Sequence, residues 1–514
     1  MGEAMEVNLS PSPVTGTSPI QPYSPSIAKP MMLDTLPKTS KTSLATLLRV
    51  PIASPIKKPI ASMQGYIKEV GNFTILDLQD SWLPITESTD GNACYSAFHT
   101  LNSGIGIQAL VLPFAFTALG WTWGIVCLSL AFVWQLYTLW LLIQLHESVS
   151  GTRYSRYLIL SMAAFGGKLG KLLALFPTMY LSGGTCVTLI IIGGGTLKIL
   201  FQILCGDTCN ATPLTTIEWY LVFTCSATII AQLPNLNSIA GVSLIGAISA
   251  VSYCTVIWVV SIAKRRPNGV SYDPLETKSA AARLCSILNA LGIIAFAFRG
   301  HNLVLEIQGT MPINAKHPSR IPMWRGVKFA YLIIAMCLFP LATGGYWAYG
   351  DLMPANGGML NALYKYHGND TSKVILILTS LLVVISCLSS FQLYAMPVFD
   401  NLEFRYTSKR NKPCPRWLRS GIRIFFGCLT FFISVALPFL PSLAGLLGGV
   451  ALPVTLAYPC FMWILMKRPQ KYSLNWCFNA ALGVLGTVLS ILVVTSAIWY
   501  LVTPGIQIHF FSPQ

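Results

Sequence analysis

Residues 102–108 read Asn-Ser-Gly-Ile-Gly-Ile-Gln and interrupt the first long apolar stretch of the chain. Residues 298–302, which read Phe-Arg-Gly-His-Asn, interrupt the sixth stretch in the same way. A membrane-spanning helix satisfies its own backbone hydrogen bonds, so unwinding is tolerated only where protein, water or a ligand replaces them. Secondary transporters place such interruptions near the membrane midplane, where they bind substrate. The two interruptions therefore predict a carrier of small molecules.

Composition places the whole chain in the membrane class. Only 10% of the 514 residues are charged, whereas soluble domains carry about 25%. The net charge is +16, but the basic residues lie in short loops and in the N-terminal tail. This distribution is typical of membrane topology and argues against a nucleic-acid partner. We expect the lipid bilayer to be the main surrounding of the protein.

Hydropathy predicts an all-α polytopic membrane protein with eleven spans. A short basic stretch at 152–171 is expected to lie in the membrane interface rather than to cross the membrane. The spans are expected near 92–116, 121–144, 172–204, 216–234, 239–262, 284–310, 327–349, 373–399, 419–440, 442–466 and 475–502.

The order of these spans predicts an internal repeat. Spans one to five and six to ten each begin with a broken helix, and each set has five members. An odd number of spans per repeat makes the two halves cross the membrane in opposite senses. This is the LeuT-type 5+5 inverted repeat, with span eleven as an addition.

Three regions with different chemistry are expected. Residues 1–88 form a disordered tail rich in Ser, Thr and Pro, which is either a regulatory segment with Ser-Pro sites or a passive leader. Residues 89–503 form the transporter domain, and 504–514 a short C-terminus.

With the N-terminus in the cytosol, 25 Lys and Arg residues fall on the cytosolic side and 8 outside. This ratio predicts a cytosolic N-terminus and an extracellular C-terminus.

Cysteine and asparagine positions predict a disulfide and two glycosylation sites. Cys205 and Cys209 flank a short polar loop and could form a disulfide if that loop is extracellular. Asn210 and Asn369 begin glycosylation sequons in predicted outer loops. No Cys or His spacing is typical of a metal site, and no nucleophile–base arrangement predicts an enzyme.

The two breaks offer complementary binding groups. Free N–H groups and a half-helix N-terminus after the first break suit a carboxylate. Free carbonyls around the second break suit an ammonium group, so a zwitterionic amino acid matches both. Each Phe can equally be an ordinary packing residue. The predicted substrate-binding residues are Ser103, Gly104, Ile105, Gly106, Gln108, Phe296, Phe298, Arg299, Gly300 and Asn302.

Ionisable residues inside a membrane are costly and mark functional sites. Arg299 either faces an anionic ligand or forms a structural ion pair with Glu306 or another acid, and it should disfavour a cationic substrate. His99, His301 and Glu306 are the candidate proton carriers. The alternative for each histidine is a neutral packing role. We expect no cofactor other than the proton as coupling ion.

Several sequence motifs resemble one known family. They lie at residues 95–99 (Tyr-Ser-Ala-Phe-His), 233–243, 295–308, 322–326 (Pro-Met-Trp-Arg-Gly) and 394–400. From about residue 90 to 503 the chain resembles the lysine/histidine transporter-like branch of the plant amino acid/auxin permeases. The resemblance implies a plant source and a proton-coupled amino acid symporter of the plasma membrane.

Together these observations predict import of neutral or acidic amino acids with protons by alternating access. A permease for another small carboxylate, such as an auxin-like acid, is the alternative within this class. A non-transporting amino acid sensor that keeps the same fold is the alternative from another class. The sequence leaves the oligomeric state open.

Overall fold

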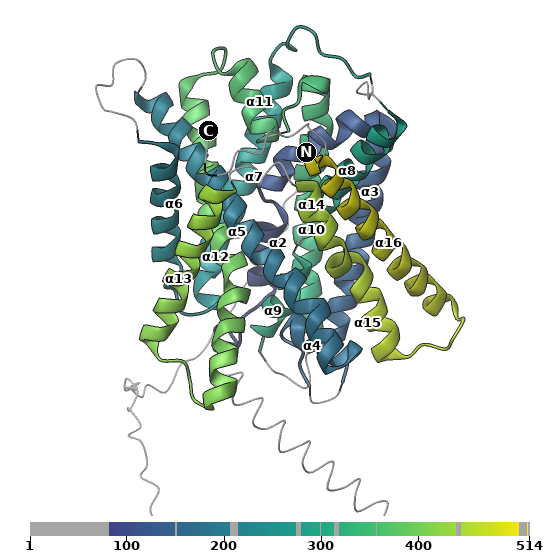
Figure 1. The fold of residues 1–514 in the computed structure, drawn as a ribbon. Helices are drawn as coiled ribbons and strands as arrows, with labels where there is room; N and C mark the ends of the chain where they lie inside the picture. The colour runs from purple at the N-terminus through teal and green to yellow at the C-terminus, as the bar shows by residue number, and fades with distance from the viewer. Residues whose placement is uncertain are drawn as a thin grey trace, which may run out of the picture. The chain divides into compact units, whose positions relative to one another are not determined.

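The computed structural model describes residues 82–149, 152–205, 214–273, 279–298, 300–312, 318–355, 357–437, 444–502 and 511. Every regular element in these ranges is a helix, and the long helices run side by side (Figure 1). The predicted N-terminal tail lies outside the described residues, except for residues 82–88. The predicted C-terminal segment also lies outside them, except for Phe511.

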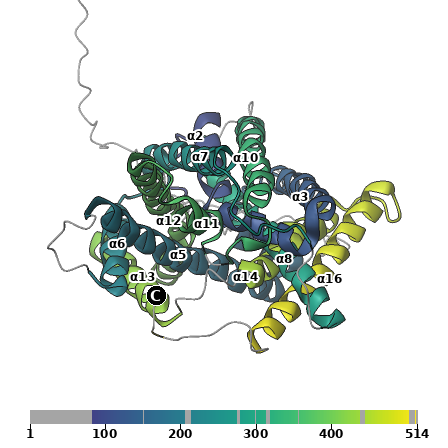
Figure 2. The ribbon, with the colours of Figure 1, turned by 90° about the horizontal axis from the view of Figure 1, so that it is seen from above.

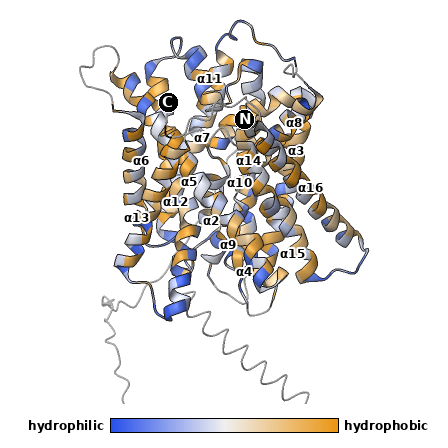
Figure 3. Ribbon diagram, viewed as in Figure 1, coloured by the Kyte–Doolittle hydropathy of each residue, from blue (hydrophilic) through white to orange (hydrophobic). Residues whose placement is uncertain are grey.

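Within the described residues, nine helical segments are long and apolar enough to cross a membrane. Hydrophobic residues predominate along these helices (Figure 3), and many of them are exposed, including Leu130, Leu172 and Leu332. Such a surface is stable only against lipid. The segments are Ile107–Leu145, Gly167–Cys205, Asn237–Ala263, Ala280–Gly309, Arg320–Leu352, Lys373–Arg410, Arg416–Ala436, Ala444–Lys467 and Leu474–Trp499.

The first predicted span consists of several pieces. Helix α2 (Ala93–Gly104) ends at the predicted interruption, and the short helix η1 (Ile107–Val111) follows and leads directly into α3 (Leu112–Leu145). Within α3, Gly120 has non-helical dihedrals (φ 69°, ψ −176°), which other residues rarely adopt. This kink separates the end of predicted span one from predicted span two.

The sixth predicted span is also divided. Helix α8 (Ala280–Ala297) ends before Phe298, whose φ of −101° and ψ of 59° are not helical, and α9 (His301–Gly309) starts after Gly300. Gly300 has a φ of 122° in the left-handed region that favours glycine. The structure therefore interrupts the helix at both places that the sequence predicts.

The other helices complete the bundle. The predicted interfacial stretch contains the nine-residue α4, which is too short to cross a membrane. Helices α5 and α12 pack against each other, and α2 contacts α7, α10 and α12 (Figure 2). The bounds are α4 (Tyr157–Phe165), α5 (Gly167–Cys205), α6 (Thr216–Ile230), η3 (Asn237–Ile239), α7 (Ala240–Ala263), α10 (Arg320–Tyr349), η4 (Gly350–Leu352), α11 (Gly358–His367), α12 (Lys373–Arg410), α13 (Arg416–Ala436) and α16 (Leu474–Val502).

The tenth predicted span contains a helix irregularity that the sequence analysis does not predict. The tenth predicted span consists of α14 (Ala444–Leu452), the π-helical segment η6 (Pro453–Ala457) and α15 (Tyr458–Lys467). The hydroxyl of Tyr157 donates to the carbonyl oxygen of Val454 at 2.9 Å. Proline lacks an N–H and leaves a carbonyl without its helical partner, which explains the irregularity at Pro453.

Residues 82–88 pack against the helices, although the sequence assigns them to the tail. Leu83 and Ile85 are buried, and the amide of Ile85 donates to Oδ1 of Asp400 at 3.4 Å. The amide of Leu236 donates to the carbonyl oxygen of Pro84 at 3.2 Å. These contacts fix the segment that leads into α2.

Candidate functional site

The two interruptions lie next to each other, although about 200 positions separate them in the sequence. A Cβ atom built on Gly300 would lie 3.1 Å from Oγ of Ser103. Ser103 belongs to the last turn of α2, and its hydroxyl donates to the carbonyl oxygen of Thr100 at 3.1 Å. The glycine therefore serves two needs, because it adopts the positive φ and leaves room for Ser103.

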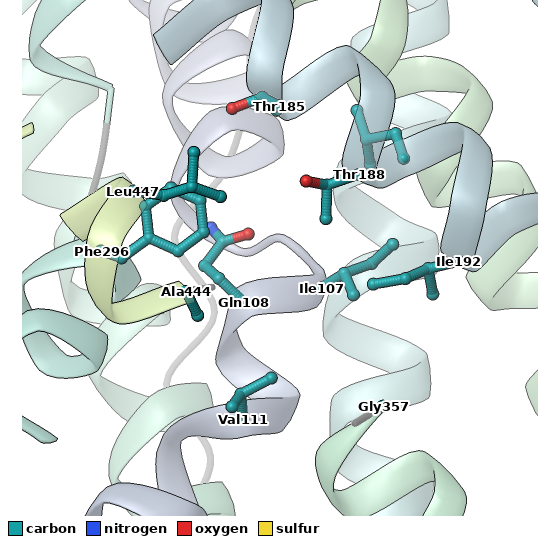
Figure 4. A pocket seen from close by; sticks show the side chains of 11 residues that line it. Ile107, Gln108, Val111, Thr185, Thr188, Ile192, Phe296, Gly357, Ala444 and Leu447 are labelled. Atoms are coloured by element: carbon teal, nitrogen blue, oxygen red, sulfur yellow. The ribbon is translucent and has the colours of Figure 1, made fainter. Parts of the chain in front are cut away.

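A cavity lies beside these interruptions, and the space between its lining atoms, including the part open to solvent, is about 410 Å³. It is formed by η1, α5, α8 and α14, together with Gly357 just before α11 (Figure 4). The lining residues are Ile107, Gln108, Val111, Thr185, Thr188, Leu189, Ile192, Phe296, Gly357, Ala444 and Leu447.

The lining of this cavity is largely apolar. Phe296 and Leu447 stand on one side, and Thr185 and Thr188 of α5 on the other, with Gln108 between them in Figure 4. None of the eleven described lining residues carries an ionisable side chain. A mostly apolar cavity with a few polar groups is typical of a small-molecule site.

A smaller space of about 230 Å³ is lined by Thr100, Ser103, Leu139, Gly300, Val304, Ile307 and Tyr331. Of the predicted substrate-binding residues, Gln108 and Phe296 line the larger cavity, while Ser103 and Gly300 line the smaller. Phe298 packs edge-on against Phe132 of α3, with ring centroids 5.7 Å apart. The residues Gly104, Ile105, Gly106, Phe298 and Asn302 line neither cavity, and Arg299 lies outside the described residues.

Helix α12 holds the end of α2 at the first interruption. Nδ2 of Asn102 donates to Oγ of Ser389 at 2.9 Å, and Oγ of Ser390 donates to Oδ1 of Asn102 at 3.2 Å. The hydroxyl of Tyr394 donates to the carbonyl oxygen of Ser103 at 2.9 Å. The carbonyl oxygen of Asn102 also accepts from Oγ of Ser390 at 3.3 Å, so buried side chains of α12 satisfy both of these backbone carbonyls.

Helices α3 and α5 hold the start of α9 at the second interruption. Nε2 of His301 lies 3.0 Å from the carbonyl oxygen of Gln135 and 3.1 Å from Oγ1 of Thr138. Nδ2 of Asn302 donates to Oγ of Ser182 at 3.3 Å. The predicted binding residue Asn302 therefore contacts a neighbouring helix.

The three candidate proton carriers occupy separate environments. His99 is fully buried in α2, where Nδ1 lies 2.8 Å from Oγ of Ser243 on α7. His301 contacts α3 as described above. Glu306 of α9 interacts electrostatically with Asp400 and Arg156. None of the three lines the larger cavity, so the structure does not bring them together around it.

A charged cluster lies where α4, α9 and α12 approach each other. Arg156, just before α4, forms a close ion pair with Asp400 of α12, and it donates to Oγ1 of Thr86 at 3.2 Å. Nε of Arg419 lies 3.0 Å from Oε2 of Glu403. Arg156 and Asp400 are almost fully buried, and buried charges persist only when they are paired in this way.

Polar contacts also connect the loop after α3 to the end of α9. Arg153 donates to the carbonyl oxygens of Gln308 and Met311 at 3.2–3.3 Å, where α9 ends. His146 is fully buried beside this arginine. Burial, with a smaller contribution from Arg153, holds the pKa of His146 well below its usual range.

The remaining predicted sites are only partly described. Cys205 is disulfide-bonded, but its predicted partner Cys209 and the sequon residue Asn210 lie outside the described residues. Asn369 is exposed between α11 and α12, and its glycosylation stays a prediction. Among the described residues, no group of three or more His, Cys, Asp or Glu side chains could hold a metal ion.

Sequence reasoning missed the part of the cavity that α5 and α14 contribute. Thr185, Thr188, Leu189 and Ile192 have the i, i+3, i+4, i+7 spacing of one helix face, and two polar members in an apolar span were a usable signal. Nothing comparable distinguishes Ala444 or Leu447. Their role follows from the packing of α14 against α8.

A family model described as transmembrane amino acid transporter protein matches residues 89–503. The chain belongs to this family. The match confirms the resemblance seen in the sequence motifs, and it agrees with the expectation of a transporter rather than an enzyme. The protein is therefore a multi-pass membrane protein of an amino acid transporter family with plant relatives.

Two relatives from Arabidopsis thaliana illustrate the relationship. Lysine histidine transporter-like 8 is 60% identical over 463 residues, which cover 90% of this chain and 89% of the relative. Lysine histidine transporter-like 7 is 48% identical over 437 residues, which cover 84% of this chain and 90% of the relative.

Solved structures share the fold. MhsT in complex with L-phenylalanine has a TM-score of 0.51 at 12% identity, covering 78% of this chain and 98% of that structure. A Na⁺-coupled sialic acid symporter in an outward-open state has a TM-score of 0.52 at 12% identity, covering 86% and 97%. This likeness confirms an all-helical polytopic membrane fold with LeuT-like structural neighbours.

Proposed function

We propose that this protein imports neutral or acidic amino acids together with protons across the plasma membrane by alternating access. The observation that carries the proposal is the position of the two interruptions at one cavity. Gln108 follows the first interruption, Phe296 precedes the second, and both line the cavity. Membership of an amino acid transporter family supplies the substrate class.

The helix ends at the cavity match the two charged groups of an amino acid. The helical segment that starts at Ile107 begins after Gly106, whose backbone is extended and whose position has no side-chain cap. Its first N–H groups suit a carboxylate, because they lie at the positive end of the helix dipole. Carbonyl groups in the last turn of α8 suit the ammonium group.

Contacts at the breaks support the 5+5 inverted repeat with eleven crossings. Asn102, near the end of α2, contacts Ser389 on the third helix of the proposed second half. Asn302, near the start of α9, contacts Ser182 on the third helix of the proposed first half. In both cases an interrupted span contacts the third helix of the other half, although Asn102 precedes its interruption and Asn302 follows its own. Eleven crossings result when Ile107–Leu145 is divided at Gly120, its first part is joined to α2 as one crossing, and the 15-residue α6 is added to the count.

The uncharged lining of the cavity favours neutral substrates. A lysine side chain would bring an ammonium group to a surface whose described residues include no acid, and burying an unpaired charge is costly. Acidic substrates depend on Arg299, which lies outside the described residues. Neutral amino acids should therefore be transported best.

The proposed orientation places the N-terminus in the cytosol. Lys and Arg number 25 on the proposed cytosolic side and 8 on the outer side. In Figure 1, α4 and α9 lie toward the lower end, which is then cytosolic, and α11 lies toward the upper end. The charged cluster around Arg156 and Asp400 would thus stand on the cytosolic side of the cavity.

Substrate-evoked current in voltage-clamped oocytes tests the proposal. Alanine should evoke an inward current that grows at acid pH and persists without sodium, and lysine should evoke a smaller current. Surface labelling confirms that the protein reaches the membrane. No current with any amino acid, despite surface expression, would contradict amino acid transport and favour a sensor or a permease for another carboxylate.

Import of lysine and histidine is the second candidate substrate range. The names of the two Arabidopsis relatives, both lysine histidine transporter-like proteins, favour it. The same recordings decide between the two ranges. A larger current with lysine than with alanine would replace the neutral substrate range by the cationic one.

A further inference from the structure

Gln135 of α3 contacts both halves of the interrupted sixth span. Its side chain is fully buried, and Nε2 donates to the carbonyl oxygen of Ala295 at 3.1 Å. Ala295 lies in the last turn of α8, where carbonyl groups have no partners further along the same helix. The amide thus satisfies a group that the interruption has exposed.

The backbone of Gln135 contacts α9, the other half of the interrupted span. Its carbonyl oxygen lies 3.0 Å from Nε2 of His301, the first residue of α9. A carbonyl can only accept, so Nε2 of His301 must carry the hydrogen. The hydroxyl of Thr138 lies 3.1 Å from the same nitrogen and donates to helix carbonyls, so it too accepts from His301.

Among the described residues, the side-chain amide of Gln135 has one hydrogen bond, and that bond is to the interruption. Its Oε1 is buried and has no hydrogen-bond partner among the described residues. A leucine of similar size would fill the space without leaving a buried oxygen unsatisfied. What a leucine could not provide is the hydrogen bond to Ala295.

We propose that Gln135 is a positioning residue that fixes the end of α8 relative to the start of α9. Phe296 on α8 lines the larger cavity and Gly300 before α9 lines the smaller one. Holding the two helix ends at a fixed spacing therefore sets the geometry at both cavities. The proposal rests on the proposed transport function for its effect on substrate.

Gln392 provides a matched control. It is also a buried glutamine on a long helix, its Nε2 donates to the carbonyl oxygen of Ala227 on α6 at 2.9 Å, and its Oε1 likewise has no described partner. Its hydrogen bonds do not involve either interruption. Gln392→Leu therefore removes the same chemistry from a different place.

The first experiment compares transport by Gln135→Leu and Gln392→Leu at equal surface expression. Loss of one hydrogen bond at the break should raise the KM of Gln135→Leu by about fivefold to tenfold, with a smaller change in maximal rate. Gln392→Leu should keep the KM of the unaltered protein. A KM unchanged in Gln135→Leu, or raised equally in both variants, would overturn the proposal.

A near-isosteric substitution separates positioning from packing. In Gln135→Glu the protonated carboxyl group can donate to Ala295, whereas the ionised form cannot. The ratio of its transport to that of the unaltered protein should therefore rise as pH falls, while the ratio cancels the titration of neighbouring His301 and the proton driving force. A flat ratio would contradict the hydrogen bond.

Amide hydrogen exchange tests the positioning role of Gln135 without a measurement of transport. The amides of Leu303 and Val304 donate to the carbonyl oxygen of Gly300 at 3.0 and 3.1 Å. Peptides covering 295–304 should exchange faster in purified Gln135→Leu than in Gln392→Leu. Equal exchange would overturn the proposal, whereas a protein that transports nothing but shows this difference would overturn only the proposed function.

Discussion

The two interruptions are proposed to bind opposite ends of the substrate, and their surroundings hold them differently. At the first, Asn102 and Ser103 are hydrogen-bonded to three side chains of α12, and the hydroxyl of Ser390 lies within reach of two oxygens of Asn102. At the second, the contacts are divided between Gln135 and Thr138 on α3 and Ser182 on α5. The contact with α5 is a single bond of 3.3 Å.

This difference predicts unequal freedom to move. Among the described residues, a motion that separates α2 from α12 must break buried hydrogen bonds to three side chains of α12, whereas one that separates α9 from α5 must break the bond between Asn302 and Ser182. Each buried polar group that loses its partner costs about 1–3 kcal/mol. We therefore expect α9 to part from α5 more easily than α2 parts from α12 during transport.

The largest effect is expected for Gly300→Ala. Alanine at a φ of 122° is strained by about 1–2 kcal/mol, and its Cβ would press on Ser103. Transport should fall by about tenfold or more at equal surface expression, measured as uptake of radiolabelled alanine. Gly104→Ala is the control, because Gly104 is helical and the atom nearest to its new Cβ is the flexible end of Ile334. Equal loss of transport in both variants would contradict a specific requirement for glycine at the second interruption.

The paired variants Asn102→Ala and Asn302→Ala compare the two interruptions directly. Asn102→Ala leaves Ser389 and Ser390 with fewer partners and should destabilise the protein by about 1–3 kcal/mol. Asn302→Ala removes one long bond and should cost less. Thermal unfolding of the detergent-purified variants measures the difference. Equal melting temperatures would contradict the unequal anchoring.

Tyr394→Phe sharpens the comparison at the first interruption alone. It removes the hydroxyl that donates to the carbonyl oxygen of Ser103, a loss of about 1 kcal/mol, and should reduce transport by about fivefold. Tyr364→Phe removes a hydroxyl at 2.7 Å from Oγ of Ser380, outside both interruptions. We expect it to transport normally. A normal rate in Tyr394→Phe would show that the first interruption does not need this anchor.

The smallest effect concerns the far end of α3, the helix that holds the second interruption. Because the folded protein keeps the pKa of His146 well below its usual range, the unfolded chain takes up a proton that the folded protein excludes. The free energy of unfolding should therefore be unaffected by this residue above about pH 6.5 and should decline below it. Chemical unfolding of the purified protein across this range measures the slope. His146→Gln should have a shallower slope, and an unchanged slope would remove His146 as a contributor.

The sequence predicted the positions of both interruptions because glycine and polar residues within an apolar span are a local signal. It also predicted Gln108 and Phe296 as substrate-binding residues, since each lies within a few residues of an interruption, and both line the larger cavity. Phe298 shows the limit of this reasoning, because only the packing of α3 reveals that its ring faces Phe132. Likewise, nothing near Glu306 in the sequence indicates that it interacts with Arg156 and Asp400.

By itself, the sequence determined the membrane class, the apolar spans, the two breaks and the family, because these depend on composition, local hydropathy and short motifs. The tertiary structure decided which groups satisfy the freed backbone, and which helices complete the cavity. Asn102 and Ser389 are 287 positions apart, and Gln135 and Ala295 are 160 apart. Such partners meet only through the packing of whole helices, and local hydropathy carries no information about that packing.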